Sequence, residues 1–376
     1  MQKTKPTNRA SEEAIFSILM LVFAIFEIVL LTVILARAAT PSRQDPQDTI
    51  DSETESESES ETEPDLPPES RPVFSGGVIP SLPTPTAQTA TLSSIDSKYA
   101  VLVNAETGEI VAGRNFDTVF SPASMTKVMT LIVACENLTK ADLERKLPLT
   151  EEIVQYVTSG EYAGTEVALP REVNGITCIG DTYRIEDLLY GIGVMSAADC
   201  TYMIAKEISG SEEAFVALMN QKAADMGLTH THFDNAVGFD SPTNVTTARE
   251  MAVILAYAMQ SETIADILKP RSERMPIQAH YVDGLEEKTY KVWFTPSFQS
   301  RLEKYPDFSL TTSTVQATKT GYTTESFLAL AASSKKDRAQ YILILGDADS
   351  GASEKISEKF KNTMLDTESI LNTYIP

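Results

Sequence analysis

An apolar stretch near the N-terminus sets the first limit on how this chain folds. Residues 14–36 contain only Ser17, Glu27 and Thr32 as polar interruptions. A helix rises about 1.5 Å per residue, so this stretch is long enough to cross a hydrocarbon core of roughly 30 Å. It is longer than the roughly 7–15 apolar residues of a typical signal peptide, although Ala36-Arg37-Ala38 resembles a cleavage site. We therefore predict a transmembrane helix or signal anchor over 14–36, with a cleaved signal as the alternative.

The charges around this stretch predict its orientation. Lys3, Lys5 and Arg9 precede it, and fewer basic residues follow it closely. Positive charge favours the cytoplasmic side, so residues 1–13 are predicted to be a cytoplasmic tail. The expected product is a single-pass protein of the cell membrane with an extracytoplasmic domain, or a secreted protein if the segment is cleaved.

The next segment lacks the residues that build a core. Pro, Ser, Thr and acidic residues dominate positions 37–92, and Glu alternates with Ser or Thr over 53–61. Such a segment buries little apolar surface, and its like charges repel each other. We predict a disordered acidic linker over 37–92 that acts as a spacer; a calcium- or cation-binding tail is the less favoured alternative. The folded domain is then expected over 93–376.

Composition narrows the remaining classes of function. The net charge is −22, whereas a nucleic-acid partner requires clustered Lys and Arg, so none is expected. Three His without HExxH or CxxC predict no metal site, and nothing predicts another cofactor. Cys135 and Cys200 lie among apolar residues and are predicted to be buried thiols, whereas Cys178, in an irregular stretch, is predicted to be exposed.

Strand-like runs begin and end the folded part, with helices between them. Helical spacing of apolar residues predicts helices over Ser124–Leu138, Ile185–Ile208 with a break near Gly191, Glu212–Met226, Thr247–Met259 and about Ala352–Tyr374. Strand-like runs cover Tyr99–Asn104, Glu109–Arg114, Phe327–Ala332 and Gln340–Leu345. The order predicts an α/β fold of the α+β type, an antiparallel sheet flanked by helices on both faces.

The first chemical motif is Ser124-Met125-Thr126-Lys127, an S-x-x-K at the start of a predicted helix. The i, i+3 spacing places the hydroxyl and the amine on one helix face, where the amine can take the hydroxyl proton. A Lys acts as a base near neutral pH when it is desolvated or lies beside another cation. A second match, Ser333-Ser334-Lys335-Lys336, lies in a polar link between strands and is interpreted as chance.

The second motif is Lys319-Thr320-Gly321, followed by Tyr322, at the end of a strand-like run. Its Lys can supply the second cation and hold a substrate carboxylate, its Thr adds a hydroxyl, and its Gly permits close approach of backbone and substrate. S-x-x-K followed by K-T-G is typical of penicillin-binding proteins and class A β-lactamases.

Longer segments resemble one family, the D-alanyl-D-alanine carboxypeptidases of serine peptidase family S11, which are low-molecular-mass penicillin-binding proteins. The similar segments are Phe120–Thr130, Glu186–Gly191, Phe215–Ala223, Thr231–Asn235 and Lys319–Thr323. The resemblance covers roughly residues 95–376. It implies a β-lactamase/transpeptidase-like fold with an all-helical subdomain, hence a DD-peptidase domain over 93–376.

The resemblance also implies roles for individual residues. Ser124 would be the acylated nucleophile, Lys127 its base, and Ser196 the middle-motif serine that relays a proton. Lys319, Thr320 and Gly321 would bind the terminal carboxylate of a D-Ala-D-Ala stem peptide of peptidoglycan. The backbone N–H groups of Ser124 and Tyr322 would form the oxyanion hole. The implied partners are that stem peptide, and β-lactams as inhibitors.

The middle motif departs from the S-x-N of the family, because Ala198 stands where the Asn is expected in Ser196-Ala197-Ala198-Asp199. Losing that amide costs a few kcal/mol of transition-state stabilisation, on the order of an oxyanion-hole deletion. Asp199 is one candidate for a replacement contact. A D-Ala-D-Ala carboxypeptidase is the first hypothesis, and a weakened enzyme, an acylation-only protein or an inactive peptidoglycan-binding pseudoenzyme are alternatives. A β-lactamase ranks lower, because no convincing E-x-x-x-N motif lies between the two motifs.

Overall fold

The structure, a computed structural model, describes residues 67–159, 162–283, 285–322, 326–348 and 356–376. The predicted cytoplasmic tail, the apolar stretch 14–36 and the linker up to residue 66 lie outside the described residues. In the described ranges no single helix is long and apolar enough to span a membrane. One bent pair, α7 (Ala248–Ala258) and α8 (Glu262–Leu268), meets the length and composition requirement only together, with a bend of 116°.

A six-stranded sheet joins the two ends of the domain. In spatial order its strands are β1 (Thr84–Thr91), β3 (Glu109–Arg114), β2 (Ser97–Asn104), β14 (Gln340–Ala348), β13 (Ser326–Ser334) and β12 (Ser313–Tyr322). The central pair aligns Leu102 with Leu343, so the N-terminal and C-terminal strands meet as predicted. All neighbours are antiparallel except β1 and β3, which are parallel. The purely antiparallel sheet predicted from the sequence is corrected at this edge.

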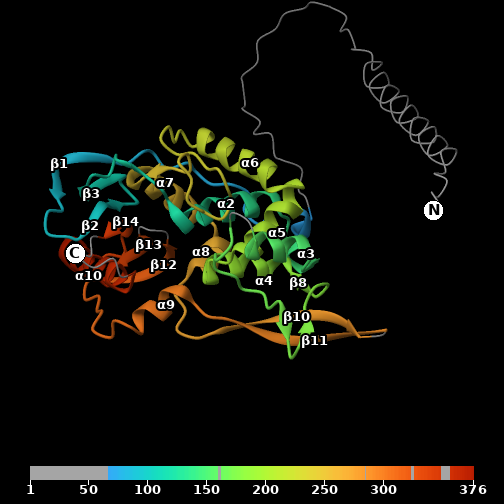
Figure 1. Ribbon diagram of the computed structural model, residues 1–376. Coiled ribbons are helices and arrows are strands. Elements are labelled where there is room, and N and C mark those ends of the chain that lie inside the picture. The colour runs from blue at the N-terminus through green and yellow to red at the C-terminus, as the bar shows by residue number, and fades with distance from the viewer. Residues whose placement is uncertain (1–66, 160–161, 284, 323–325, 349–355) are drawn as a thin grey trace, which may run out of the picture. The chain divides into compact units, whose positions relative to one another are not determined.

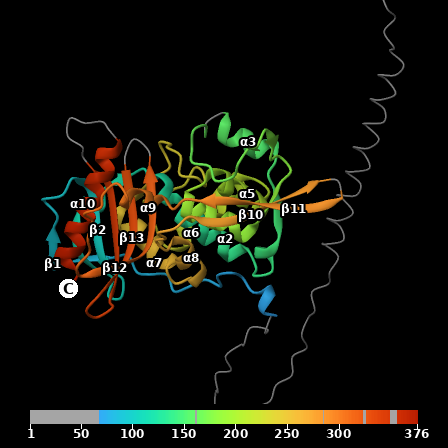
Figure 2. The same cartoon turned by 90° about the horizontal axis from the view of Figure 1, so that it is seen from below.

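Helices cover both faces of this sheet, because side chains alternate along each strand. Val101 and Val103 of β2 face the core that contains α2 (Thr126–Asn137) and α7. Ala100 and Leu102 face the opposite side, which is covered by α10 (Ile356–Tyr374) and α9 (Ser297–Leu302). Figures 1 and 2 show α10 on the side of the sheet away from the helical region.

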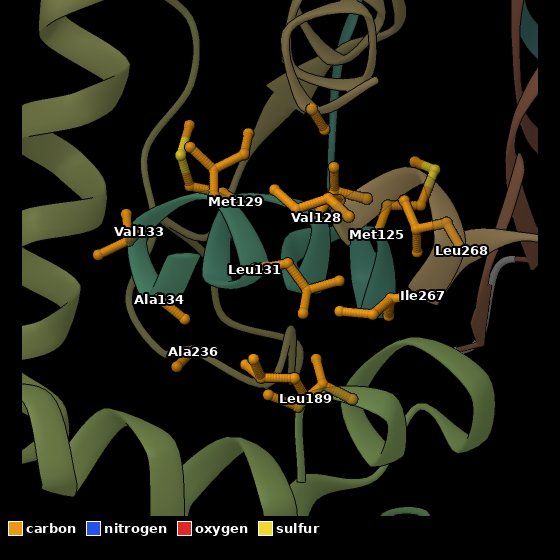
Figure 3. Close-up of a cluster of buried hydrophobic side chains, with 14 of the residues drawn as sticks. Met125, Val128, Met129, Leu131, Val133, Ala134, Leu189, Ala236, Ile267 and Leu268 are labelled. Carbon is orange, nitrogen blue, oxygen red and sulfur yellow. The ribbon is translucent and has the colours of Figure 1, made fainter. Parts of the chain in front are cut away.

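The helical region is built around α2. Its other helices are α3 (Glu151–Thr158), α4 (Ile185–Tyr190), the π-helical turn Gly191–Met195, α5 (Ala198–Ser209) and α6 (Glu212–Asp225). Figure 3 shows side chains of α2 pointing outward to several neighbours, including Leu189 of α4 and Ile267 of α8. A Cβ atom added at Gly193 would lie 2.3 Å from the side chain of Ile267, so this glycine permits close packing of the π turn on α8. The predicted helices and the break near Gly191 are confirmed.

This region is not all-helical as the family resemblance predicted. A second sheet has the order β11 (Glu286–Phe294), β10 (Met275–Asp283), β8 (Thr182–Arg184) and β5 (Lys146–Pro148). Two small pairs join β4 (Val119–Phe120) to β9 (Thr246–Thr247) and β6 (Glu172–Val173) to β7 (Ile176–Thr177). Short 3₁₀ turns cover Pro68–Ser70, Ala123–Met125 (η2) and Asp142–Glu144. The long β10–β11 hairpin extends away from the body of the domain in Figure 1.

The ordered domain begins before residue 93, so the predicted linker over 37–92 is wrong for residues 67–92. Phe74 is buried, and its N–H donates to the Cys135 carbonyl oxygen at 2.8 Å. The Gln260 side chain binds both the N–H and the carbonyl oxygen of Val78, and β1 then pairs with the sheet edge. A Pro-rich, polar segment builds no core of its own. The buried Phe74 and the pairing of β1 with β3 attach this segment to the core of the domain.

One prediction about the cysteines is also corrected. Cys135 and Cys200 are buried as predicted, but Cys178 is buried too. The Tyr290 hydroxyl of β11 donates to the Cys178 sulfur at 3.3 Å and to the Asp181 carboxylate at 2.6 Å. The β10–β11 hairpin, which the sequence did not reveal, therefore covers this thiol.

Candidate active site

Ser124 lies on the buried turn η2, directly before α2. The preceding residue, Ala123, has a φ of 49°, an uncommon value for a residue with a side chain. Gly238 packs against this turn, since a Cβ atom there would lie 1.9 Å from the Ala123 carbonyl oxygen. A strained turn and a close backbone contact thus hold the serine in place, as is common at functional sites.

Lys127 lies one turn further along the chain, in the first turn of α2, and the structure brings its amine to the predicted partner. Lys127 Nζ is 3.1 Å from Ser124 Oγ and 2.5 Å from the Val237 carbonyl oxygen. Burial lowers the pKa of Lys127 to about 8, against the opposing effect of the Glu166, Asp199 and Glu212 carboxylates. With that pKa, about one tenth of the amine is neutral at pH 7 and able to accept a proton.

A tight turn over residues 235–239 holds the Val237 carbonyl oxygen against this amine. The Asn235 side-chain oxygen accepts the N–H groups of Gly238 and Phe239 at 2.7 and 2.9 Å. Thr130 of α2 donates to the Ala236 carbonyl oxygen at 2.7 Å. Sequence reasoning missed this role, although an Asn three residues before a Gly is a turn signal that could have suggested it.

Ser196 and Lys319 form a second hydroxyl–amine pair. Ser196 ends the π turn in the left-handed region, with a φ of 60°, and its Oγ is 2.9 Å from Lys319 Nζ of β12. Burial lowers the pKa of Lys319 well below its usual range, and the charge of Lys127 lowers it further. The turn η2 packs against β12, so the two motifs lie side by side. The predicted residues Ser124, Lys127, Ser196 and Lys319 therefore converge.

Thr320 contacts a residue that the sequence did not suggest. Its hydroxyl lies 3.1 Å from the Ser297 hydroxyl of α9. Arg301 follows Ser297 by one helical turn; its guanidinium stacks on the Phe360 ring, and burial lowers its pKa to about 10. Among the described residues no carboxylate forms an ion pair with Arg301. Lys319, Thr320 and Arg301 together make this end of the site suited to an anion.

Two predicted residues are placed only through their backbone. Gly321 pairs with Phe327 of β13, and Tyr322 ends β12 opposite Ser326. The oxyanion-hole role of the Ser124 and Tyr322 N–H groups stays a prediction.

Ala198 lies in an apolar cluster and not in a polar gap. The buried residues of this cluster are Ala198, Val157 and Val237, and the half-buried ones are Tyr156, Tyr162, Val167 and Phe239. Asp199 does not replace the missing amide, because its carboxylate accepts backbone N–H groups of Ala168, Leu169 and Cys200. The suggestion that Asp199 supplies the replacement contact is thus wrong. Within the described ranges, no group of three His, Cys, Asp or Glu could hold a metal ion.

Known proteins are similar to this chain in sequence. D-alanyl-D-alanine carboxypeptidase DacF of Bacillus subtilis is 29% identical over 250 residues, which cover 66% of this chain and 57% of that relative. DacC of Escherichia coli is 31% identical over 236 residues, with 58% of each chain covered. The chain thus spans less than two thirds of the length of these curated relatives.

Solved structures agree on the fold. A Streptomyces DD-transpeptidase variant superposes with a TM-score of 0.58 at 22% identity, covering 74% of this chain and 99% of its own. Penicillin binding protein 5 from Haemophilus influenzae gives 0.55 at 20% identity, covering 74% and 70%. The predicted transpeptidase-like fold is confirmed. A family model described as D-alanyl-D-alanine carboxypeptidase, Peptidase S11, matches residues 85–350, more than half of the chain, which therefore belongs to that family.

Proposed function

We propose that this protein is a serine D-Ala-D-Ala carboxypeptidase that removes the terminal D-Ala from peptidoglycan stem peptides. The observation that carries the proposal is the 3.1 Å contact between Ser124 Oγ and a buried lysine amine with a pKa of about 8. A desolvated amine beside a hydroxyl is the arrangement that activates a serine nucleophile.

In the acylation step, Ser124 Oγ attacks the carbonyl carbon between the two D-Ala residues, and the neutral Lys127 amine takes its proton. The C–N bond then breaks, and the departing D-Ala amine receives a proton relayed through Ser196. Water hydrolyses the resulting ester and regenerates Ser124. Lys319 lies 2.9 Å from the Ser196 hydroxyl and keeps that serine oriented for the relay.

The terminal carboxylate of the substrate is proposed to bind where Lys319, Thr320 and Arg301 meet. Arg301 makes no ion pair among the described residues, so its guanidinium is available to an incoming carboxylate. The same site accounts for penicillin binding, because a β-lactam also presents a carboxylate beside a reactive carbonyl.

The first test is intact mass spectrometry of the full-length chain after incubation with penicillin, beside Ser124→Ala. An adduct of one penicillin on the wild type and none on S124A is expected. Release of D-Ala from an acyl-D-Ala-D-Ala peptide completes the test. A folded wild-type protein that takes no adduct and releases no D-Ala contradicts the proposal.

Ala198 supports a second candidate, a peptidoglycan-binding pseudoenzyme on the same fold. This candidate predicts that the peptide binds but that no D-Ala is released over hours. A protein that forms the penicillin adduct but releases no D-Ala would be an acylation-only protein.

We also propose that the domain acts outside the cytoplasm, attached to the membrane through residues 14–36. The apolar run and the basic residues before it support this placement. Accessibility of the domain to protease added to intact spheroplasts tests it; protection of the domain from protease contradicts it.

A further inference from the structure

The β10–β11 hairpin ends the second sheet with an uncovered edge. β11 is the last strand in the order β11-β10-β8-β5 and, among the described residues, pairs only with β10. Its nine residues include no proline, and its pairing with β10 has no bulge. Proteins commonly protect such an edge with a proline, a bulge or a covering segment, so β11 is open to another strand unless its charges prevent pairing. Figure 1 shows the hairpin extending away from the domain, where a second molecule can reach it.

The register of the hairpin decides which backbone groups of β11 face outward. The last pair before the turn is Asp283 with Glu286, with only two residues between them, and residues that flank such a turn hydrogen-bond to each other. Hydrogen-bonded and non-hydrogen-bonded pairs alternate along antiparallel strands. Glu287, Thr289 and Lys291 therefore lie in non-hydrogen-bonded pairs, and their N–H and C=O groups point away from β10.

The charges along β11 match a second copy of the same strand in one register. When Thr289 lies opposite its own copy in an antiparallel pair, Glu287 of each chain lies opposite Lys291 of the other. Opposite charges then meet twice, once on each side of the two-fold axis, and such cross-strand pairs are stabilising. The outward backbone groups of the same three residues also meet, so they can form the hydrogen-bonded pairs of the new ladder.

The neighbouring registers lack this match. Centring the pair on Glu287 or on Lys291 places like charges opposite each other, and centring it on Lys288 places two ammonium groups face to face. Centring it on Tyr290 brings no opposite charges together, because Glu287 then lies opposite Trp293. Like charges directly opposite each other are destabilising, so the charges favour the register centred on Thr289 and oppose most others.

Both charged groups of this register are available. Lys291 is exposed and forms no ion pair among the described residues. Glu287 keeps 56% of its side chain exposed and contacts Lys146 and His280 through the same oxygen, Oε1. The Oε2 atom of Glu287 is therefore left for the Lys291 amine of a second copy.

The same register covers apolar side chains that the single chain exposes. Leu285 at the turn is fully exposed, and Trp293 near the other end of β11 is 44% exposed. These two residues are equally far from Thr289 on opposite sides, so Leu285 of one copy comes level with Trp293 of the other. Contact between them adds a hydrophobic contribution that the charges alone do not supply.

We propose that β11 is a self-association surface, through which two copies of this protein join in the antiparallel register centred on Thr289. The two four-stranded sheets then form one continuous sheet, and both copies use the same patch, as closed two-fold symmetry requires. A strand edge is smaller than a standard protein interface, so the expected association is weak, in the micromolar range. None of the residues of this edge belongs to the candidate active site, so the inference does not rest on the proposed function.

The first experiment crosslinks an added cysteine at the centre of the contact. The three cysteines of the chain are buried, so in full-length Thr289→Cys, held in detergent, the added thiol is the accessible one. A short bismaleimide should convert this variant to covalent dimers. Gln278→Cys is the matched control, because Gln278 is exposed on the adjacent strand β10 and lies about 20 Å from its copy in the proposed register. Its dimer yield should be at least tenfold lower.

Exchange of charges tests the register itself. In the T289C background, Lys291→Glu and Glu287→Lys should each slow crosslinking about tenfold, because two exposed ion pairs become like-charge contacts. A mixture of these two variants should recover the rate of T289C, since Lys and Glu again lie opposite each other between unlike copies. The double variant E287K/K291E should recover it for the same reason. Gln278→Glu, a new charge beside the contact, should leave the rate within twofold.

Sedimentation equilibrium of the full-length chain without the added cysteine is the second measurement. The wild type and E287K/K291E should dimerise alike, and K291E should need about tenfold higher concentration. Equal crosslinking at positions 289 and 278, an unchanged rate in K291E, or a mixture no faster than its two components overturns the proposal. Dimers that persist in K291E would form through another part of the chain, which also overturns it.

Discussion

Two lysines on neighbouring helices, the buried Lys127 and the half-buried Lys222, show how the partners and the burial of an amine together set its pKa. Lys222 of α6 lies 2.6 Å from the Glu136 carboxylate and 2.8 Å from the Tyr257 hydroxyl. Burial alone would lower the pKa of Lys222, but its hydrogen bonds to Glu136 and Tyr257 outweigh burial and raise it. Lys127 has only a hydroxyl and a carbonyl oxygen as hydrogen-bond partners, and its pKa falls.

The two amines differ in their hydrogen-bond partners as well as in their burial. A carboxylate neutralises Lys222 and keeps it protonated, so it can only hold structure. Neutral oxygens compensate the burial of the Lys127 ammonium less than a bonded carboxylate would, so Lys127 loses its proton more readily than Lys222. Burying Lys127 therefore costs free energy that the ion pair of Lys222 with Glu136 avoids. Such a cost is expected where the pKa of a group is tuned for a reaction.

The largest expected effect in this comparison is on the rate of penicillin acylation. Lys127→Met removes the base, so the rate should fall about 10³-fold, the usual contribution of a positioned general base. The melting temperature should not fall, because an apolar chain of similar length replaces a poorly solvated amine. Stopped-flow acylation and thermal melting measure the two quantities. A rate within tenfold of the wild type would show that Lys127 is not the base.

Lys222→Met should show the reverse. It leaves the half-buried Glu136 without its cation, which should lower the free energy of unfolding by about 1–3 kcal/mol. The acylation rate per folded molecule should stay within twofold. Urea denaturation measures the loss, and adding Glu136→Gln should recover part of it because the uncompensated charge is then gone. An unchanged stability in K222M would mean that the Lys222–Glu136 ion pair contributes no net stability to the fold.

Restoring the family motif should not restore the family site. Ala198→Asn places a larger polar side chain in a filled apolar cluster, so we expect a loss of about 1–3 kcal/mol in stability and no gain in acylation rate. Denaturation and acylation kinetics check both parts, with Ala198→Ser as the smaller polar control. Faster acylation with unchanged stability would show that loop 162–169 moves aside for the introduced Asn side chain at no cost and would contradict this prediction.

The smallest effect is a shift in pH dependence. Lys127 acts as a base when neutral, so the acylation rate should rise with pH and level off above about pH 8. Glu166 opposes the lowering of the Lys127 pKa, so E166Q should move this rise to lower pH, while E172Q leaves it in place. Acylation rates between pH 6 and 10 measure the shift. A move to higher pH in E166Q would contradict the assigned electrostatics.

Local patterns predicted the elements that carry the motifs. The S-x-x-K spacing and the apolar periodicity placed Ser124 and Lys127 on one helix, and the strand-like runs placed β2, β3, β13 and β14. The contacts that complete the site join residues far apart in the chain, such as Lys127 with Val237 and Ser196 with Lys319, 110 and 123 positions apart. No periodicity connects such pairs.

The elements that were not predicted from the sequence lack the apolar periodicity that identified the other helices and strands. The β11 strand runs Glu-Glu-Lys-Thr-Tyr-Lys-Val-Trp-Phe, mostly charged or polar at its start, so it did not stand out as a strand. Residues 162–169 form a loop whose position depends on a buried Asp199 and on the size of Ala198. The effect of Glu166 and Arg301 on the site depends on neighbours that are distant in the chain. The sequence therefore did not suggest either residue.

The parallel edge strand β1 also bears on how this protein can be handled. A shortened chain that begins at Ser93, the boundary suggested by composition, would lose β1 and the buried Phe74. The backbone of β3 would then present unpaired N–H and C=O groups along an open edge, a template for another copy of the chain. Such a product would self-associate through β3, whereas a chain that begins before Pro67 would keep its own edge covered.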